Sequence, residues 1–422
     1  MSEVVDRWVE KCHDLPNIGE MTHMERMHKA FDLEEPDMVP VALEVDEWQV
    51  PYAGYDFFET WENVDKLTDA VLKTWHDLRQ DVIWPYFDPS HTLDPYLTTE
   101  QRKTAYDLRD GKSYVVFHEV TKDFDEIIKV FESKPWEKHG LGRLASHYLP
   151  HFDQCLEFQH KMGDTVPVVI GLPNPSNIAE WTVGVENFLK WTIREPKEKV
   201  HYYMQMITDF LVGAAESCRP YADDGVEFCC VFGGARTWGP RQFEEFGIYD
   251  RIFAEKCADV FKYPFHHICG HNLPLAMQAL ATMPYPAIQY DESMRQLGWS
   301  WAEWCEWVAR LNNGIACVMN APTTQAAAYK STEHNRQMVK EFIEHSVPHT
   351  TAVIMPGCEL SVGTPTENVF AIVKAAREFG RYPDCKTKAE QIWTKESFQE
   401  SLAKYGMHLP DWGYHYRTYP SK

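Results

Sequence analysis

The sequence predicts an α/β protein: a (β/α)8 barrel of the TIM type with a helical N-terminal extension and insertions. Eight short apolar segments recur along the chain, and helical patterns separate them. Buried parallel strands have this appearance, and each parallel pair needs a long connection, usually a helix. No repeat, low-complexity block or flexible linker divides the 422 residues. We therefore expect a single domain over residues 1–422, with the barrel proper at roughly 21–382.

Each predicted strand is an apolar run bounded by Pro, Gly, Asp or Asn. The eight runs span residues 39–45, 81–87, 166–171, 225–232, 264–269, 287–291, 315–320 and 351–355. Residues 112–121 are also strand-like and predict a hairpin between the second and third strands.

Helices are predicted between these strands, and two of them carry capping signals. A capping box at Thr22–Glu25 opens a helix that runs through Ala30. A second signal, Thr364–Glu367, provides a capping hydroxyl with Pro at the first helical position, before a helix at 368–379 that ends at Gly380. Two further helical stretches lie at residues 181–191 and 197–217.

The composition predicts a soluble, cytoplasmic protein. The net charge of −22 opposes nucleic acid or an anionic membrane surface as a partner. Eleven cysteines without a regular framework favour a reducing compartment over a disulfide scaffold. No apolar run is long enough for a membrane span, and the N-terminus does not have the pattern of a signal peptide.

Three residues predict a zinc site. His267 and Cys269 stand at i and i+2 of a predicted strand, so both side chains project to one face and can hold one ion. Cys358 follows 89 positions later, just beyond the eighth strand, and a barrel would bring it to the same mouth. Two Cys and one His with an open fourth position are typical of catalytic zinc. The alternative is that these are ordinary buried thiols.

The order of these features resembles the uroporphyrinogen decarboxylase superfamily, and within it the zinc-dependent cobamide (corrinoid) methyltransferase branch. The resemblance covers residues 21–382 and is carried by the opening at Met21–Pro40, by Trp238–Phe246 and by Pro356–Val369. The His-x-Cys and distant Cys of that family correspond to His267, Cys269 and Cys358.

The sequence departs from the decarboxylases in two places. Where those enzymes carry an arginine-rich segment for the substrate's carboxylates, this chain has Glu44, Asp46 and Glu47, which would repel an octa-anionic tetrapyrrole. The decarboxylase's aspartate after strand four falls near Cys230. The chain is also longer than typical thiol methyltransferases of the branch, around 90–165 and after 383.

The resemblance implies transfer of a methyl group from a methylated small molecule to the Co(I) corrinoid, of the cobalamin type, carried by a partner protein. Aromatic residues make up 14% of the chain, and those near strand ends favour a methoxylated aromatic donor, hence O-demethylation. The alternatives are a methylcobamide:thiol (coenzyme M-like) or pterin methyltransferase, a decarboxylase-like enzyme, and a non-catalytic tetrapyrrole-binding barrel. A homodimer is one candidate assembly.

Further site residues are predicted from their places at strand ends. Candidates for a fourth zinc ligand, or for a contact behind the ligands, are Glu227, Cys230 and Glu359. Glu44 and Asp46 end the first strand and are alternatively solvated. For each aromatic candidate the alternative is packing under a loop. The predicted contacts to substrate or corrinoid are Trp48, Trp84, Tyr86, Trp238, Asp291 and Asn320.

Overall fold

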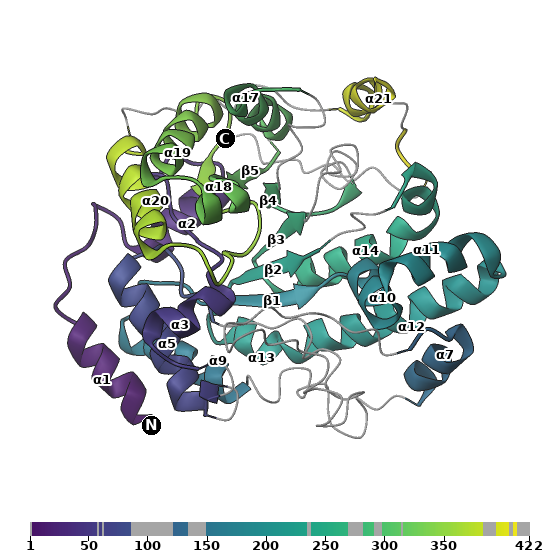
Figure 1. Cartoon of the computed structure of the whole chain (residues 1–422), viewed down its shortest axis with the longest axis horizontal. Coiled ribbons are helices and arrows are strands. Elements are labelled where there is room, and N and C mark those ends of the chain that lie inside the picture. The colour runs from purple at the N-terminus through teal and green to yellow at the C-terminus, as the bar shows by residue number, and fades with distance from the viewer. Residues whose placement is uncertain are drawn as a thin grey trace.

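At the centre of the protein is a parallel sheet of six strands in chain order, β1 to β6 (Figure 1). The computed structural model describes residues 2–56, 59–60, 63–85, 121–133, 149–233, 238–268, 282–290, 298–313, 315–382, 394–404 and 408–411. All six strands are buried along their length, as their apolar sequences predict. They are β1 (Val169–Pro173), β2 (Phe228–Phe232), β3 (Tyr263–Ile268), β4 (Ala287–Tyr290), β5 (Cys317–Asn320) and β6 (Ala352–Ile354).

Two extended segments complete the ring between β6 and β1. Val41 forms a parallel bridge with Ile354 of β6, and Ile83 forms one with Val168 beside β1. The two segments join each other where the Asp81 N–H donates to the Val41 carbonyl at 2.6 Å. The first two predicted strands are therefore in place but lack regular ladders. With them, eight segments follow one another in the order of the predicted (β/α)8 barrel.

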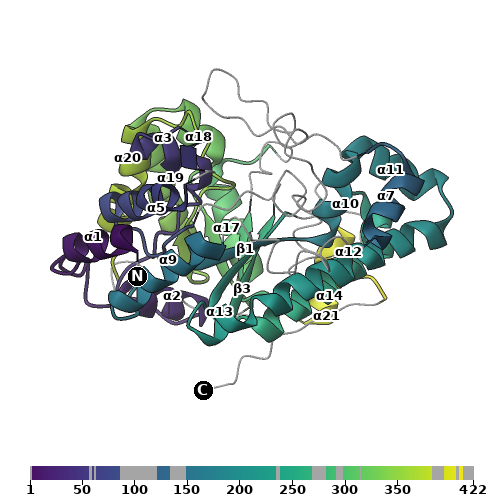
Figure 2. The same ribbon diagram turned by 90° about the horizontal axis from the view of Figure 1, so that it is seen from below.

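Helices surround the sheet (Figure 1). Seen from below, α7, α10 and α11 lie together at one side of the molecule, away from α1, α5 and α20 (Figure 2). None of the described helices is long and apolar enough to cross a membrane. The helices are α1 (Glu3–Cys12), α2 (His23–Phe31), α3 (Gln49–Ala53), α5 (Val64–Leu78), α7 (Phe124–Glu132), α9 (Leu149–Lys161), α10 (Pro175–Val183), α11 (Val185–Arg194), α12 (Lys197–Ser217), α13 (Arg219–Asp223), α14 (Pro240–Val260), α17 (Trp301–Asn312), α18 (Thr324–Tyr329), α19 (Thr332–Ser346), α20 (Thr366–Phe379) and α21 (Lys395–Ala403), with a 3-10 turn η1 at Asp46–Trp48.

Two helix predictions are confirmed. Thr22 caps α2 through its side chain, which accepts from the Glu25 N–H, while the Glu25 carboxylate accepts from the Thr22 N–H. The helix ends at Phe31, one residue beyond the prediction. The helix predicted at 197–217 is α12.

Other local predictions are wrong. The residue that caps α20 is Pro365, and no side chain caps that helix; the Thr364 carbonyl instead accepts from the Trp48 indole at 2.8 Å. The helix predicted at 181–191 is broken at Gly184, whose φ of 81° is accessible to glycine but not to a helix. Strands β1 and β2 each begin three residues later than predicted. The hairpin predicted at 112–121 lies almost entirely outside the described residues.

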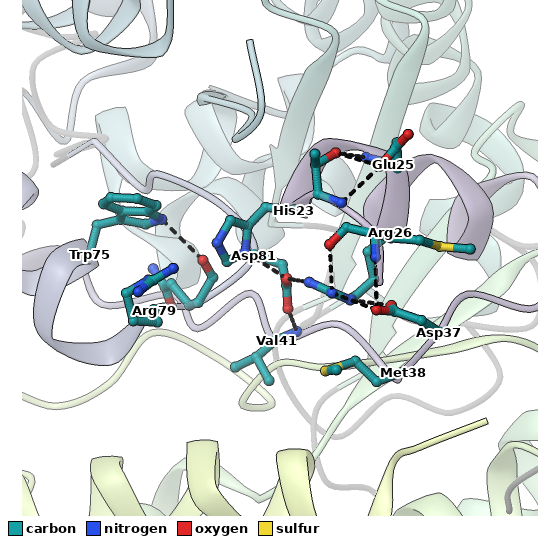
Figure 3. Close-up of polar contacts among 12 residues, drawn as sticks. His23, Glu25, Arg26, Asp37, Met38, Val41, Trp75, Arg79 and Asp81 are labelled. Carbon is teal, nitrogen blue, oxygen red and sulfur yellow. Dashed lines mark hydrogen bonds and ion pairs between the residues drawn. The ribbon is translucent and has the colours of Figure 1, made fainter. Parts of the chain in front are cut away.

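A buried ionic network holds the two extended segments where the sheet hydrogen bonds are sparse (Figure 3). Asp81 is fully buried and accepts from His23 at 2.8 Å, from Arg377 at 2.8 Å and from the Val41 N–H at 2.7 Å. Arg26 bonds to both Asp81 and Asp37. We call His23, Arg26, Asp37, Asp81 and Arg377 the Asp81 cluster.

The charges in the Asp81 cluster are matched. Burial alone would raise the pKa of Asp81, but the Arg377 and Arg26 guanidiniums hold that pKa well below its usual range. The cluster thus joins α2, both extended segments and α20 through charge-assisted hydrogen bonds.

Candidate active site

A cavity of about 140 Å³ lies at the C-terminal ends of the strands. This is the face on which enzymes of this fold place their active sites. The part of the lining that the structure describes contains three carboxylates and three large aromatic side chains, and no lysine or arginine. It consists of Glu44, Asp46, Trp84, Pro85, Val169, Gly171, Asn177, Trp181, Cys230, Phe232, His267, Cys358 and Glu359.

Two of the three predicted zinc ligands meet in this cavity. His267 is near the end of β3, and Cys358 is on the loop after β6. The Cys358 side chain is hydrogen-bonded to His267. Cys269 lies outside the described residues, and within the described part of the chain no group of three His, Cys, Asp or Glu side chains is placed to hold a metal ion.

The amide of Gln289 holds the His267 ring in place. Gln289 is the β4 residue opposite His267 in the sheet, and its Oε1 contacts the ring Nδ1. Its Nε2 donates to the Pro356 carbonyl and, at 3.3 Å, to Glu44 Oε2. An amide oxygen can only accept, so Nδ1 donates and Nε2 is the nitrogen left for an ion. One side chain thereby connects the imidazole to the loop that carries Cys358.

The charge around His267 is strongly negative. Glu44 Oε2 lies 3.7 Å from His267 Nδ1. Burial alone would lower the pKa of His267, but the Glu44 carboxylate and Cys358 raise it to about 10. Without a metal ion, the imidazolium is thus the positive charge that these neighbours stabilise.

The other acids confirm this imbalance. Burial raises the pKa of Glu359 well above its usual value, and Asp46, Cys358 and Glu44 raise it further, against a hydrogen bond from Glu47 that lowers it. The pKa of Cys230 is raised by burial and then by Glu44 and Asp46. These acidic groups lie close together in the part of the cavity that the structure describes, and a bound divalent cation would stabilise their charged forms. The imidazole, the thiol and their amide support fit Zn2+.

Residues 22–379 match the sequence family described as uroporphyrinogen decarboxylase (URO-D). The chain belongs to the uroporphyrinogen decarboxylase family. Within this family it is similar to a methylated-thiol–coenzyme M methyltransferase of Methanosarcina mazei, with 24% identity over 246 residues, 56% of this chain and 60% of that protein. It is also similar to the methylcobamide:CoM methyltransferase of Methanosarcina barkeri, with 20% identity over 221 residues, 52% of this chain and 61% of that protein. The chain therefore spans about 60% of the length of these curated relatives.

A solved structure shows the same fold. A methyltransferase from Methanosarcina mazei superposes with a TM-score of 0.66 at 18% identity, covering 85% of this chain and 99% of that one. The sequence-based assignment to the uroporphyrinogen decarboxylase family and to its α/β barrel is confirmed.

The aromatic residues predicted to contact substrate or corrinoid do not all lie at the cavity, and their contacts stay a prediction. Trp84 lines the cavity, and its indole N–H donates to Asp46 at 2.9 Å. Trp48 does not line it, because its ring stacks on Tyr52 with centroids 4.6 Å apart. Trp238 packs against the aromatic rings of α11 and α14 instead. Tyr86 lies outside the described residues.

Of the other predicted site residues, some line the cavity and some do not. Cys230 and Glu359 line the cavity, and their role as a fourth ligand or as a contact behind the ligands stays a prediction. Glu227 does not, because it stands at the opposite end of β2, 2.9 Å from His28 and 3.2 Å from Lys262. Its prediction as a fourth ligand is wrong. Asn320 is buried outside the described lining, where its Oδ1 accepts from the next N–H, and Asp291 is not among the described residues.

Four site residues have a clearer role in the structure than the sequence indicated. Glu44 and Asp46 are 6% and 5% exposed, so they are buried in the site rather than solvated. Trp181 of α10 stacks on Phe232 of β2, at 6.1 Å and 24°, and both rings line the cavity. The sequence did indicate that Phe232 could reach the site, because it ends a predicted strand two positions after Cys230. Trp181 was part of a predicted helix, and nothing in the sequence indicated a place in the site.

Proposed function

We propose that this protein is a zinc-dependent methyltransferase that acts between a small molecule and the corrinoid of a partner protein. The main support for this proposal is that His267 and Cys358 line the same cavity at the C-terminal face of the barrel. The names of the curated relatives, both methyltransferases, support the reaction class.

The residues of this chain have distinct tasks in this proposal. His267, Cys269 and Cys358 would hold Zn2+. When bound, the ion would stabilise the negative charge on the small-molecule atom that loses or gains the methyl group. Gln289 fixes the His267 ring and its protonation, and the aromatic side chains shield the reacting atoms from water.

The donor we propose first is a methoxylated aromatic compound, which would be O-demethylated. A cavity of about 140 Å³ is similar in size to cavities that hold one aromatic ring. Trp84, Trp181 and Phe232 offer flat apolar surfaces to such a ring. A corrinoid is much larger than the cavity, so the partner protein would present it at the mouth.

A second candidate is the opposite transfer, from a methylated corrinoid to a thiol or pterin. The names of the two curated relatives favour it, since both include a thiol or coenzyme M. Porphyrin decarboxylation is disfavoured, because Glu44, Asp46 and Glu359 would face the carboxylates of uroporphyrinogen. We expect no coproporphyrinogen from the pure enzyme.

The test is an absorbance assay with zinc-loaded protein. Free Co(I) cobalamin is mixed with methoxylated aromatics, and in a parallel series methylcobalamin is mixed with thiols or reduced pterin. Formation or loss of methyl-cobalt in either series, abolished in Cys358→Ala and kept in Glu227→Gln at the far end of β2, supports the proposal. Absence of methyl transfer in both series, with zinc bound, would refute it.

A further inference from the structure

Asn177 lines the cavity with a side-chain amide that is buried and has no hydrogen-bond partner in the described part of the chain. It stands in the first turn of α10, and the residue is 6% exposed. Its backbone N–H donates to the Asn174 carbonyl, so only the amide is left over. Buried amides in proteins are ordinarily hydrogen-bonded, because an amide that loses water without gaining a partner costs free energy. A polar group of a bound small molecule would supply the missing partner.

The close approach of Gly233 fixes the place of this amide. A Cβ atom at Gly233 would lie 1.4 Å from Asn177 Nδ2, so the amide occupies space that only a glycine leaves free. The φ of 74° at Gly233 is also in the left-handed region that favours glycine. The Asn174 side chain donates to the Gly233 carbonyl at 2.5 Å and so ties the end of β2 to the start of α10. The amide is therefore a built part of the cavity wall.

The amide and part of the aromatic wall come from the same helix. Trp181 follows Asn177 by four positions on α10, so the two side chains share one face of the helix, and both line the cavity. Phe232, which stacks on Trp181, directly precedes Gly233 at the end of β2. The predicted zinc ligands reach the same cavity from β3 and from the loop after β6. A molecule that lies against these two rings can reach the amide with one group and the zinc ligands with another.

The chemistry of an amide selects an uncharged group. Asparagine offers two donors on Nδ2 and an acceptor at Oδ1, and it has no net charge. A neutral amide cannot compensate for the burial of an ionised group, whereas a hydroxyl costs less to bury and either donates to Oδ1 or accepts from Nδ2. A hydroxyl is also small, and a cavity of about 140 Å³ has little room beyond one aromatic ring. Both properties favour a hydroxyl group as the partner.

We propose that Asn177 is a specificity-determining residue that binds a hydroxyl group of the small-molecule substrate, away from the atom that exchanges the methyl group. This inference rests on the proposed function and names a feature of its substrate. In the donor direction the substrate would be a hydroxylated aryl methyl ether, and in the opposite direction a hydroxylated thiol. A compound without the hydroxyl would leave the buried amide unpaired, and its binding would be weaker for that reason.

Pairs of compounds that exchange a hydroxyl for a methyl group test the proposal. The ortho, meta and para isomers of methoxyphenol are compared with the matching methoxytoluenes, and for the opposite transfer mercaptoethanol is compared with propanethiol. The members of each pair have nearly the same size. We expect kcat/KM to be roughly tenfold or more higher for the hydroxyl compound of at least one pair, measured from methyl-cobalt absorbance. If no hydroxyl compound reacts better than its methyl counterpart, the inference is overturned.

Variants assign the preference to one side chain. Asn177→Leu keeps the approximate size of the residue but removes both hydrogen-bonding atoms, so the preference should disappear, mainly through KM, while the methyl compound reacts at least as well as before. Asn187→Leu on α11, the same change outside the described lining, loses a bond to the Val183 carbonyl and should keep the preference. An unchanged preference in Asn177→Leu would contradict the assignment. If that variant does not fold, the paired compounds with the unmodified protein still decide.

A binding measurement separates this inference from the proposed reaction. Calorimetry with the same compounds on zinc-loaded protein, without cobalamin, reports affinity in the absence of turnover. The ratio of the affinities for the hydroxyl and the methyl compound should be roughly tenfold lower in Asn177→Leu than in the unmodified protein, and unchanged in Asn187→Leu. That result supports the inference even if no methyl transfer is found. An equal ratio in Asn177→Leu, or no binding of any hydroxyl compound, refutes the inference and leaves methyl transfer to its own test.

Discussion

The protein contains two buried groups of acids near opposite ends of the same two extended segments, and they differ in how their charge is balanced. In the Asp81 cluster, Arg26 and Arg377 bond to the carboxylates. In the cavity, Glu44 lies 3.7 Å from His267, while Glu44 and Asp46 both act on Glu359 and raise its pKa. The pKa of Asp81 is accordingly lowered, whereas the pKa of Glu359 is raised.

This difference separates a structural role from a functional one. A buried charge that is fully paired within the chain needs no ligand, and its partners hold elements together. A buried group of like charges is costly to the fold, and such groups cluster at functional sites. The comparison therefore predicts opposite responses when single acids are removed from the two groups.

The largest effect is expected at the proposed zinc site. Cys358→Ala should lose bound metal and methyl transfer while the barrel remains folded, because the residue lies on a loop at the cavity rather than in the core. Zinc sites are worth roughly 10–16 kcal/mol in small domains, so losing one ligand should weaken binding by orders of magnitude. Elemental analysis measures this as about one zinc per chain falling to a small fraction.

The matched control for that experiment is Cys317→Ala, a buried thiol on β5 outside the described lining. It should retain zinc. If Cys358→Ala kept all of its zinc, the cavity thiol would be no more important for metal binding than the buried thiol of Cys317, and the proposed zinc site would be wrong.

The next largest effect should come from the Asp81 cluster. Asp81→Ala leaves Arg26 buried with one carboxylate partner fewer, and breaking such a pair costs about 3–5 kcal/mol of unfolding free energy. Urea unfolding measures the loss. Glu216→Ala, which breaks an exposed pair with Arg219, should change stability little. Equal stability of the two variants would contradict the structural role of the cluster.

A smaller effect is expected at Gln289. Gln289→Leu keeps the size of the side chain but removes the contacts to His267 and Pro356, and losses of this kind cost about 10–100-fold in metal affinity. Competition with a chromophoric chelator measures the zinc affinity, and the spectrum of the Co2+-loaded protein reports ligand geometry. The exposed Gln337 on α19 offers the control Gln337→Leu, which should bind zinc normally. Unchanged affinity in Gln289→Leu would show that His267 needs no such support.

The smallest effect is the pH dependence of stability in metal-free protein. Because the pKa of Glu359 is raised in the folded state, folding becomes less favourable as the pH rises from the ordinary value of that group towards its folded value. Glu359→Gln should therefore be more stable than the unmodified protein at about pH 8, and the advantage should shrink at lower pH. Urea unfolding at several pH values measures it.

The Asp81 cluster should show the opposite trend. Its lowered pKa supplies stability that is present above the ordinary pKa of an aspartate and is lost as the pH falls below it. If Glu359→Gln were less stable than the unmodified protein at alkaline pH, the two groups of acids would not differ in the way described.

Much of the architecture could be predicted because the strands are short apolar runs whose neighbours lie in chain order. The pairing of His267 with Cys358 followed from the same rule, since strand ends of a barrel meet at one face. The break at Gly184 and the uncapped start of α20 were missed because local propensities are weak beside tertiary packing. Trp48 and Trp84 have the same chemistry in the sequence, and packing alone sent the first against Tyr52 and the second to the cavity.

By itself, the sequence determined the order of the barrel segments and the soft, zinc-preferring side chains at their ends, because apolar pattern and ligand chemistry belong to single residues. Only the tertiary structure decided which acids are neutralised. Asp81 and Glu359 are both acidic side chains in the sequence, yet one is enclosed by arginines and the other by carboxylates. Electrostatic energy depends on burial and on distances between residues far apart in the chain, and the fold sets both.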